Sequence, residues 1–71
     1  MNTRKIVKLL HEGKYAAEIE VEIIDSEEGW APYISLDDAL KLDLVRNALR
    51  SGDLATALRY GKVYKLSPVA A

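Results

Sequence analysis

Few residues of this chain are of the types that carry out nucleophilic, acid–base or metal chemistry. His11 is the only histidine, so one chain cannot assemble a histidine pair or a histidine-rich metal site. The absence of cysteine excludes a thiol nucleophile, a disulfide framework and every cysteine-based zinc or iron–sulfur site. Because His11 precedes a short polar connector, we expect it to be a solvated residue beside a turn.

Two pairs of carboxylates have the spacing that acid–base catalysis can use. Glu20 and Glu22 stand two residues apart, while Asp37 and Asp38 are adjacent. We expect the first pair to lie on an open strand face and the second pair to cap a helix. The four serines fall in turn or cap positions, and the four glycines are too scattered for a phosphate-binding loop. The sequence therefore predicts a protein that is not an enzyme, with no catalytic residue, cofactor or metal site.

Length and composition are those of one small folded domain. The 71 residues suffice for a single domain over residues 1–71, and 49% hydrophobic with 30% charged residues is typical of folded chains. The formal net charge of −1 produces no global attraction to nucleic acid or an anionic membrane. No apolar run approaches the roughly 20 residues that cross a bilayer, and the charged start differs from a signal peptide. We therefore expect a cytoplasmic protein without a membrane partner.

So short a chain without disulfides is close to the lower size limit for a stable hydrophobic core. Chains at this limit often gain their remaining stability from a partner or from a second copy of themselves. The size therefore favours association, either with another protein or as a homodimer.

The clearest periodic pattern lies in residues 15–23, where odd positions are apolar and positions 18, 20 and 22 are glutamates. This period of two predicts a half-buried strand with an acidic row on one face. Residues 4–11 are also compatible with a strand, and residues 12–14 predict a three-residue hairpin turn with a bulge. We expect Lys5 and Lys8 to lie near the glutamate row, where opposite charges on neighbouring strands stabilise a sheet modestly.

Residues 35–52 have the features of a helix with defined ends. Ser35 is a typical N-cap residue followed by acidic residues, and Gly52 is a natural stop. Apolar residues at four-residue intervals predict the buried stripe of this helix, widened by three further apolar positions. The stripe comprises Leu36, Leu40, Leu44 and Ala48, with Ala39, Val45 and Leu49 beside it.

Three further elements complete the expected order. Pro32 limits residues 30–34 to an edge strand or an extended segment. Asp53 can cap a short second helix that ends near Tyr60, and residues 62–67 alternate as a last strand. The predicted fold is α+β, a small antiparallel sheet in the order β-β-(β)-α-α-β with a helical pair packed on one face.

Charge is unevenly distributed along the chain. Residues 1–14 sum to +3, residues 15–43 to −8 and residues 44–71 to +4. Neutralisation between neighbouring strands explains most of this pattern, since charged rows usually mark a solvated face. The functional alternative is an acidic surface of Glu18, Glu20 and Glu22 that binds a small basic protein.

The segment around Trp30 is a second candidate contact site. A large aromatic residue on a proline-bearing edge segment is poorly placed for complete burial, although aromatic residues more often cover a small core. We therefore predict that Trp30, Pro32 and Tyr33 bind a protein partner together with the glutamate row.

A basic stretch in the second half of the chain offers an alternative function. It surrounds two expected helices joined by a glycine-containing turn, as in helix-turn-helix motifs. The start of the second helix is apolar, whereas a recognition helix presents polar base-reading residues there. The second hypothesis is therefore a dimeric regulator that binds nucleic acid through basic side chains. These are Arg46, Arg50, Arg59 and Lys62.

Three segments are distinctive when taken together. They follow the expected hairpin and comprise residues 28–39 with Gly29-Trp30-Ala31-Pro32-Tyr33, residues 46–54 with Gly52-Asp53-Leu54, and Val63-Tyr64-Lys65-Leu66-Ser67-Pro68-Val69. With them the chain resembles a group of short bacterial proteins that are described as antitoxins of toxin–antitoxin pairs. This resemblance implies a regulatory role beside a partner encoded in the same operon, and no catalytic residue. A weaker similarity to HicB-type antitoxins lies in the order of a small sheet and a helix, without the Pro-Gly-Cys-like segment typical of that family.

Overall fold

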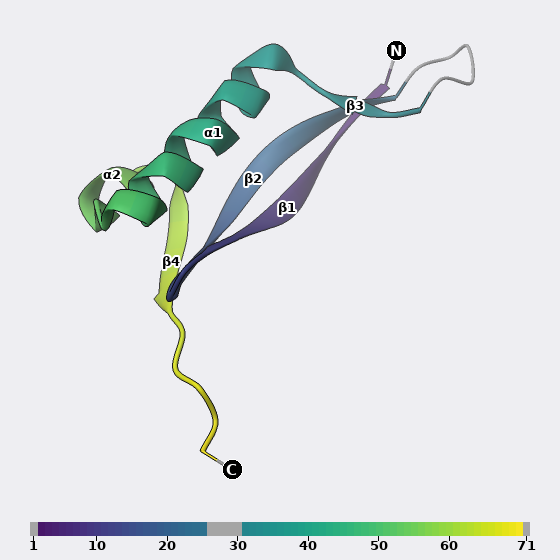
Figure 1. Ribbon diagram of the computed structural model, residues 1–71. Coiled ribbons are helices and arrows are strands. Elements are labelled where there is room, and N and C mark those ends of the chain that lie inside the picture. Colours follow the sequence, from purple (N-terminus) through teal and green to yellow (C-terminus); the bar gives the residue numbers. More distant parts are fainter. Residues whose placement is uncertain (1, 26–30, 71) are drawn as a thin grey trace.

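The computed structural model describes residues 2–25 and 31–70 (Figure 1). All pairs of strands in this part of the chain are antiparallel, and the element order is β-β-β-α-α-β, which confirms the predicted α+β fold. The elements are β1 (Asn2–Glu12), β2 (Tyr15–Asp25), β3 (Tyr33–Ile34), α1 (Leu36–Ser51), α2 (Leu54–Leu58) and β4 (Gly61–Lys65).

Strands β1 and β2 form a long hairpin in continuous register, from Asn2 opposite Asp25 to Glu12 opposite Tyr15. Only two residues separate the paired ends, so the expected three-residue turn with a bulge is wrong. Gly13 has a φ of 59°, the left-handed value that a two-residue hairpin turn needs at its first central position. Glu12 therefore continues the ladder as the last residue of β1.

Strands β3 and β4 both pair with the other edge of β2, one at each end. Strand β4 pairs with residues 15–19 of β2, whereas β3 pairs with residues 23 and 24. Among the described residues no strand lies beside residues 20–22 on that edge. The sheet is therefore only two strands wide in its middle.

The predicted caps of both helices are present. The Ser35 hydroxyl oxygen accepts the backbone N–H of Asp38 at 3.2 Å, which fixes the start of α1. Gly52 ends α1 with a φ of 77°, a left-handed conformation that suits glycine. Asp53 then caps α2 by accepting from the backbone N–H and the hydroxyl of Thr56. Helix α2 is shorter than the sequence suggests.

The core lies between the two helices and one face of the sheet. Strand β2 contributes Ala17 and Ile19, both with no exposed surface, followed by Val21. Burial of this alternate set confirms that β2 is a half-buried strand. The other members of the core are Leu10, Leu42, Val45, Ala48, Leu49 and Ala57.

The buried face of α1 agrees with the predicted stripe at Val45, Ala48 and Leu49 and differs from it at the other leucines. Leu36, Leu40 and Leu44 are exposed by 73%, 58% and 42%. The residues that α1 buries, at positions 42, 45, 48 and 49, follow the alternating spacing of three and four that keeps one face on a helix. A strict spacing of four turns the stripe by about 40° at each step, so the leucine series leaves the core.

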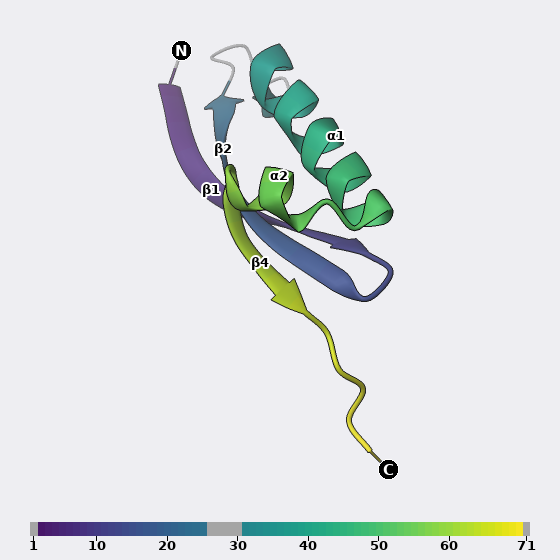
Figure 2. The same cartoon turned by 90° about the vertical axis from the view of Figure 1, so that its left-hand side faces the viewer.

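The molecule has two layers, with both helices on the same side of the sheet (Figure 1). The turned view shows the segment after β4 running away from the body of the molecule (Figure 2), and Val69 in this segment is 95% exposed. No helix in residues 2–25 and 31–70 has the length and apolar character needed to span a membrane. The face of the sheet opposite the helices is covered by no described element.

Candidate interaction surface

The gap beside residues 20–22 of β2 is closed by side chains of α1 instead of a strand. The Asp38 carboxylate accepts the backbone N–H of Glu22 at 2.7 Å, and the Lys41 ammonium donates to the carbonyl oxygen of Glu20 at 2.7 Å. Asp38 and Lys41 also form an ion pair at 3.3 Å. The helix therefore satisfies backbone groups that would otherwise form an open sheet edge.

The electrostatics of Asp38 reflect this contact. Its pKa lies below the usual value, first because the carboxylate accepts the N–H of Glu22 and also because Lys41 donates to it, while partial burial opposes the shift. The sequence indicated a capping role for the aspartate pair but missed this link to a strand residue sixteen positions away. A contact between elements that far apart in the chain leaves no periodic signal.

The side of the sheet away from the helices carries a mixed apolar and acidic surface. The register places Val7 opposite Glu20, and Leu9 opposite Glu18. Val7 and Leu9 are 62% and 64% exposed, and Tyr64 of β4 is 41% exposed. We call this surface the open face. It is defined by Lys5, Val7, Leu9, Glu18, Glu20, Glu22, Lys62 and Tyr64.

Neighbours within the sheet neutralise part of the glutamate row. Lys5 lies 3.6 Å from Glu20, and the Tyr64 hydroxyl donates to the Glu18 carboxylate. Lys62 stands opposite Glu18 in the ladder between β2 and β4. The pKa of Tyr64 is raised, chiefly because its hydroxyl donates to Glu18. The open face thus combines an exposed apolar ridge with a row of partly paired carboxylates.

The predicted position of the two strand lysines is correct for one of them. Lys5 stands opposite Glu22 on the open face, whereas Lys8 stands opposite Ile19 on the helix side. The expectation for Lys8 is wrong because residues three apart in a strand point to opposite faces.

The contact segment predicted around Trp30 is described only in part. Trp30 lies outside the described residues, while Pro32 and Tyr33 are exposed. Tyr33 pairs with Ile24, two positions beyond Glu22, and therefore shares the side of the sheet that carries the glutamate row. The structure brings Tyr33 to the end of the open face that is remote from the hairpin turn.

A hollow of about 280 Å³ lies in the open face, bordered by Val7, Glu18, Glu20 and residues 60–62. Gly61 permits this arrangement, because a Cβ atom there would lie 2.0 Å from the carbonyl oxygen of Glu18. The hollow is shallow and opens to solvent, so it suits a protruding side chain of another protein rather than an enclosed small molecule.

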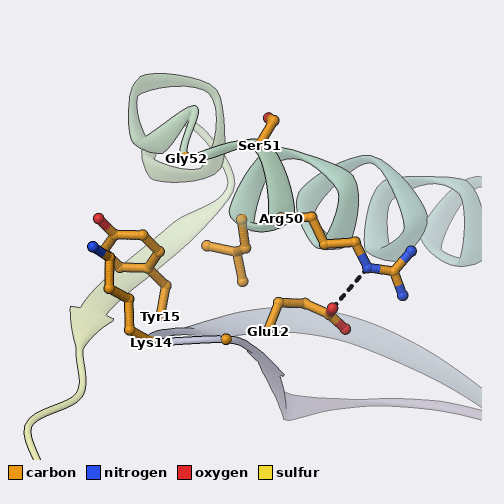
Figure 3. Close-up of a pocket in the computed structure, with 8 residues that line it drawn as sticks. Glu12, Lys14, Tyr15, Arg50, Ser51 and Gly52 are labelled. Atoms are coloured by element: carbon orange, nitrogen blue, oxygen red, sulfur yellow. Dashed lines mark hydrogen bonds and ion pairs between the residues drawn. The ribbon is translucent and has the colours of Figure 1, made fainter.

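A pocket of about 430 Å³ lies between the hairpin turn and the C-terminal end of α1 (Figure 3). The Glu12 carboxylate faces Arg50 across this space and accepts from its guanidinium at 2.7 Å. Arg46 lies 3.7 Å from the same carboxylate. The pKa of Glu12 is lowered, chiefly by the hydrogen bond from Arg50. Glu12 therefore fastens the hairpin to α1, a role that the sequence did not indicate.

Two polar side chains near this pocket make local contacts. The Ser51 hydroxyl donates to the carbonyl oxygen of Ala48. His11 lies near the turn with its Nε2 2.8 Å from the carbonyl oxygen of Gly13, as expected for an exposed turn residue. Within residues 2–25 and 31–70 no three acidic or histidine side chains come together as metal ligands.

The four cations of the nucleic-acid hypothesis lie on different parts of the molecule. Arg46 and Arg50 bind Glu12 on the helix side of the sheet. Lys62 lies on the open face, and Arg59 ends α2. The structure therefore does not bring these cations together as one basic surface.

These observations define a two-layer α+β domain with one face covered by helices and one open face. The chain matches no protein-family model, and neither a curated protein nor a solved structure shows significant similarity to it.

Proposed function

We propose that the protein is a non-catalytic interaction module, an antitoxin-like regulator that binds a small basic protein through its open face. The observation that carries this proposal is the pair Val7 and Leu9, each more than three-fifths exposed beside a row of carboxylates. An apolar patch with a charged rim is typical of a protein-binding surface.

The charge of the open face indicates the chemistry of the partner. Three glutamates stand among two lysines, and the ion pair of Lys5 with Glu20 leaves both side chains mostly exposed, at 73% and 62%. Exposed pairs of this kind contribute little stability, so a basic side chain of a partner can replace Lys5 at small cost. A partner with basic residues around an apolar knob therefore fits this face, with Pro32 and Tyr33 extending the contact at one end.

The proposal is tested by capturing partners with the tagged protein from its native cells at moderate salt. The expected result is one stoichiometric small basic protein, identified by mass spectrometry, that binds the purified chain again. The variant Glu20→Lys should weaken this binding at least tenfold. Asp43→Lys is the matched control, since Asp43 is 67% exposed, pairs with one cation and lies on α1.

Two outcomes would contradict the proposal. Equal loss of binding in Glu20→Lys and Asp43→Lys would show that the partner responds to net charge rather than to the open face. Recovery of nucleic acid in place of a protein would favour the alternative, a dimeric nucleic-acid-binding regulator. Such binding would depend steeply on salt concentration and would weaken in variants of Arg46, Arg50, Arg59 or Lys62.

A further inference from the structure

Strand β1 presents the longest uncovered edge in the described part of the sheet. It pairs with β2 alone and offers eleven residues, compared with five in β4 and two in β3. All of β1 is exposed except Leu10 and Glu12. Long open edges of this kind readily pair with a strand from another chain.

The register shows which backbone groups of β1 point outward. Glu20 and Glu22 direct their backbone groups toward α1, away from β1. In an antiparallel ladder, alternate residues bond to the same neighbour, so the odd residues of β2 bond to β1. Their partners are the even residues of β1, as in Ile6 opposite Val21. The N–H and C=O groups of Thr3, Lys5, Val7, Leu9 and His11 therefore point away from the sheet.

We propose that β1 pairs in antiparallel fashion with β1 of a second copy, about a two-fold axis that passes through Val7. This proposal is independent of the function proposed for the open face. The two sheets would join into one continuous sheet, with about ten new backbone hydrogen bonds from the odd residues. The helices of both copies would lie on the same side, and the two open faces would form one surface.

The accessible surface is larger than that of a compact chain of this mass. The chain exposes 5310 Å², whereas a monomer of 7.9 kDa is expected to expose about 4400 Å². The excess of about 900 Å² means that more of this chain is uncovered than in a compact monomer of its mass. Its radius of gyration of 14.3 Å also exceeds the roughly 11 Å expected for a compact domain of this length. The exposed edge strand and the extended segment after β4 both add to this excess.

Charge selects the register of this pairing. With Val7 on the axis, Lys5 faces the partner's Leu9, and Ile6 faces the partner's Lys8, so no like charges stand opposite each other. A shift that puts Ile6 on the axis would set Arg4 against the partner's Lys8. A shift that puts Lys8 on the axis would set two copies of Lys8 against each other. Like charges directly opposite destabilise a sheet, so the Val7 register is favoured over both shifts. A register with Leu9 on the axis avoids like charges too, but it pairs fewer of the outward-pointing odd residues.

Ion pairs within each copy reduce the remaining repulsion. Arg4 lies 3.5 Å from Asp25, and Lys5 lies 3.6 Å from Glu20. Two of the three cations of β1 are therefore already paired with a carboxylate of their own copy when the two edges come together. The two lysines at position 8 would stand off the axis, each opposite an isoleucine of the other copy.

Single-cysteine variants test the register directly, because the natural chain has no cysteine. In the proposed dimer the two Val7 Cα atoms lie about 5.5 Å apart, which suits a disulfide. The two Leu9 Cα atoms would lie about 14 Å apart, too far for a disulfide. Mild oxidation should therefore convert most of Val7→Cys to a covalent dimer, whereas Leu9→Cys should form no covalent dimer. The two positions are matched in exposure, at 62% and 64%.

Two further measurements make the outcome decisive. Mixed Lys5→Cys and Leu9→Cys copies should cross-link with each other, because these residues face one another in the proposed register.

Sedimentation equilibrium of the unmodified chain should give a mass of twice 7.9 kDa. Val7→Pro should restore the monomer and leave the circular dichroism spectrum unchanged. Equal cross-linking at positions 7 and 9, or a monomer at all accessible concentrations, would overturn the proposal. A dimer that Leu40→Glu dissociates, and Val7→Pro does not, would place the contact on α1 instead.

Discussion

The two sides of the central strand β2 are completed in different ways. On one side β3 and β4 pair with the two ends of β2, and between them Asp38 accepts the N–H of Glu22 while Lys41 donates to the carbonyl oxygen of Glu20. On the other side β1 pairs with β2 and then presents eleven residues whose outer edge has no neighbour in the described chain. The chain can protect an edge with helix side chains, and it does so on one side alone. This difference supports the proposal that the edge of β1 pairs with β1 of a second copy.

The largest expected effect separates two adjacent residues of β1. The N–H of Ile6 bonds to β2, whereas the N–H of Val7 points outward, so only Ile6→Pro removes a ladder hydrogen bond. Ile6→Pro should lower the free energy of unfolding by about 3 kcal/mol or more. Val7→Pro should change it by less than about 1 kcal/mol under conditions where the chain is monomeric. Urea titrations followed by circular dichroism measure both, and equal losses would show that the assigned direction of these groups is wrong.

The next effect concerns the completed edge of β2. At Gly61 a Cβ atom would lie 2.0 Å from a backbone oxygen and 2.9 Å from the side chain of Ile19. Gly61→Ala should therefore cost about 2 to 3 kcal/mol, since β4 must move away from β2. Gly52→Ala is the control, because Gly52 has open space around its α-carbon and only its φ of 77° penalises alanine, by about 1 kcal/mol. A smaller loss for Gly61→Ala than for Gly52→Ala in thermal unfolding would contradict this packing.

A smaller effect is expected where α1 closes the gap. Asp38→Ala removes both the hydrogen bond to Glu22 and the ion pair with Lys41, whereas Asp38→Asn keeps an oxygen that can accept. The melting temperature should fall more for Asp38→Ala than for Asp38→Asn. Asp37→Ala, at an exposed neighbouring position, should leave it nearly unchanged. Amide exchange of Glu22 should accelerate in Asp38→Ala alone, and unchanged exchange there would exclude the proposed closure.

The smallest effect is a dependence on pH. The pKa values of Asp38, Glu12 and Asp53 are lowered in the folded chain, so the folded state binds fewer protons than the unfolded state at mildly acidic pH. Their contribution to stability is complete above the unfolded pKa values, about 4, and is lost as the pH falls through the lower folded values. The melting temperature should therefore drop below pH 4, and the drop should be shallower in Asp38→Asn. If the melting temperature depended on pH in the same way in both proteins, Asp38 would contribute nothing to the loss of stability in acid.

Much of the fold was predictable from local sequence patterns. The alternation of residues 15–23 gave the strand and its buried face, and Ser35, Gly52 and Asp53 gave the helix ends, because these signals depend on near neighbours in the chain. The buried side of α1 was not predictable from the leucines. Four-residue spacing is also found on an exposed face, and tertiary packing buried Leu42 beside Val45, Ala48 and Leu49, which the predicted stripe already contained.

The candidate surface was predictable in its acidic part and not in its apolar part. The glutamate row followed from periodicity, and its partial neutralisation by Lys5 followed from the hairpin. The exposure of Val7 and Leu9 could not be predicted from the sequence pattern, because a strand of mixed apolar and basic residues does not reveal which of its faces a helix covers. The contacts of Glu12 with Arg50 and of Asp38 with Glu22 join residues far apart in sequence, which local patterns cannot indicate.

Amide hydrogen exchange along β1 tests the contrast between the two edges most directly. At low protein concentration the amides of Arg4, Ile6, Lys8 and Leu10 should exchange slowly because they bond to β2, whereas those of Lys5, Val7 and Leu9 should exchange fast. At high concentration the odd amides should become protected as the second copy pairs with them. Fast exchange of the odd amides at every concentration would show that β1 is an unpartnered edge, and uniform exchange along β1 would contradict the alternation itself.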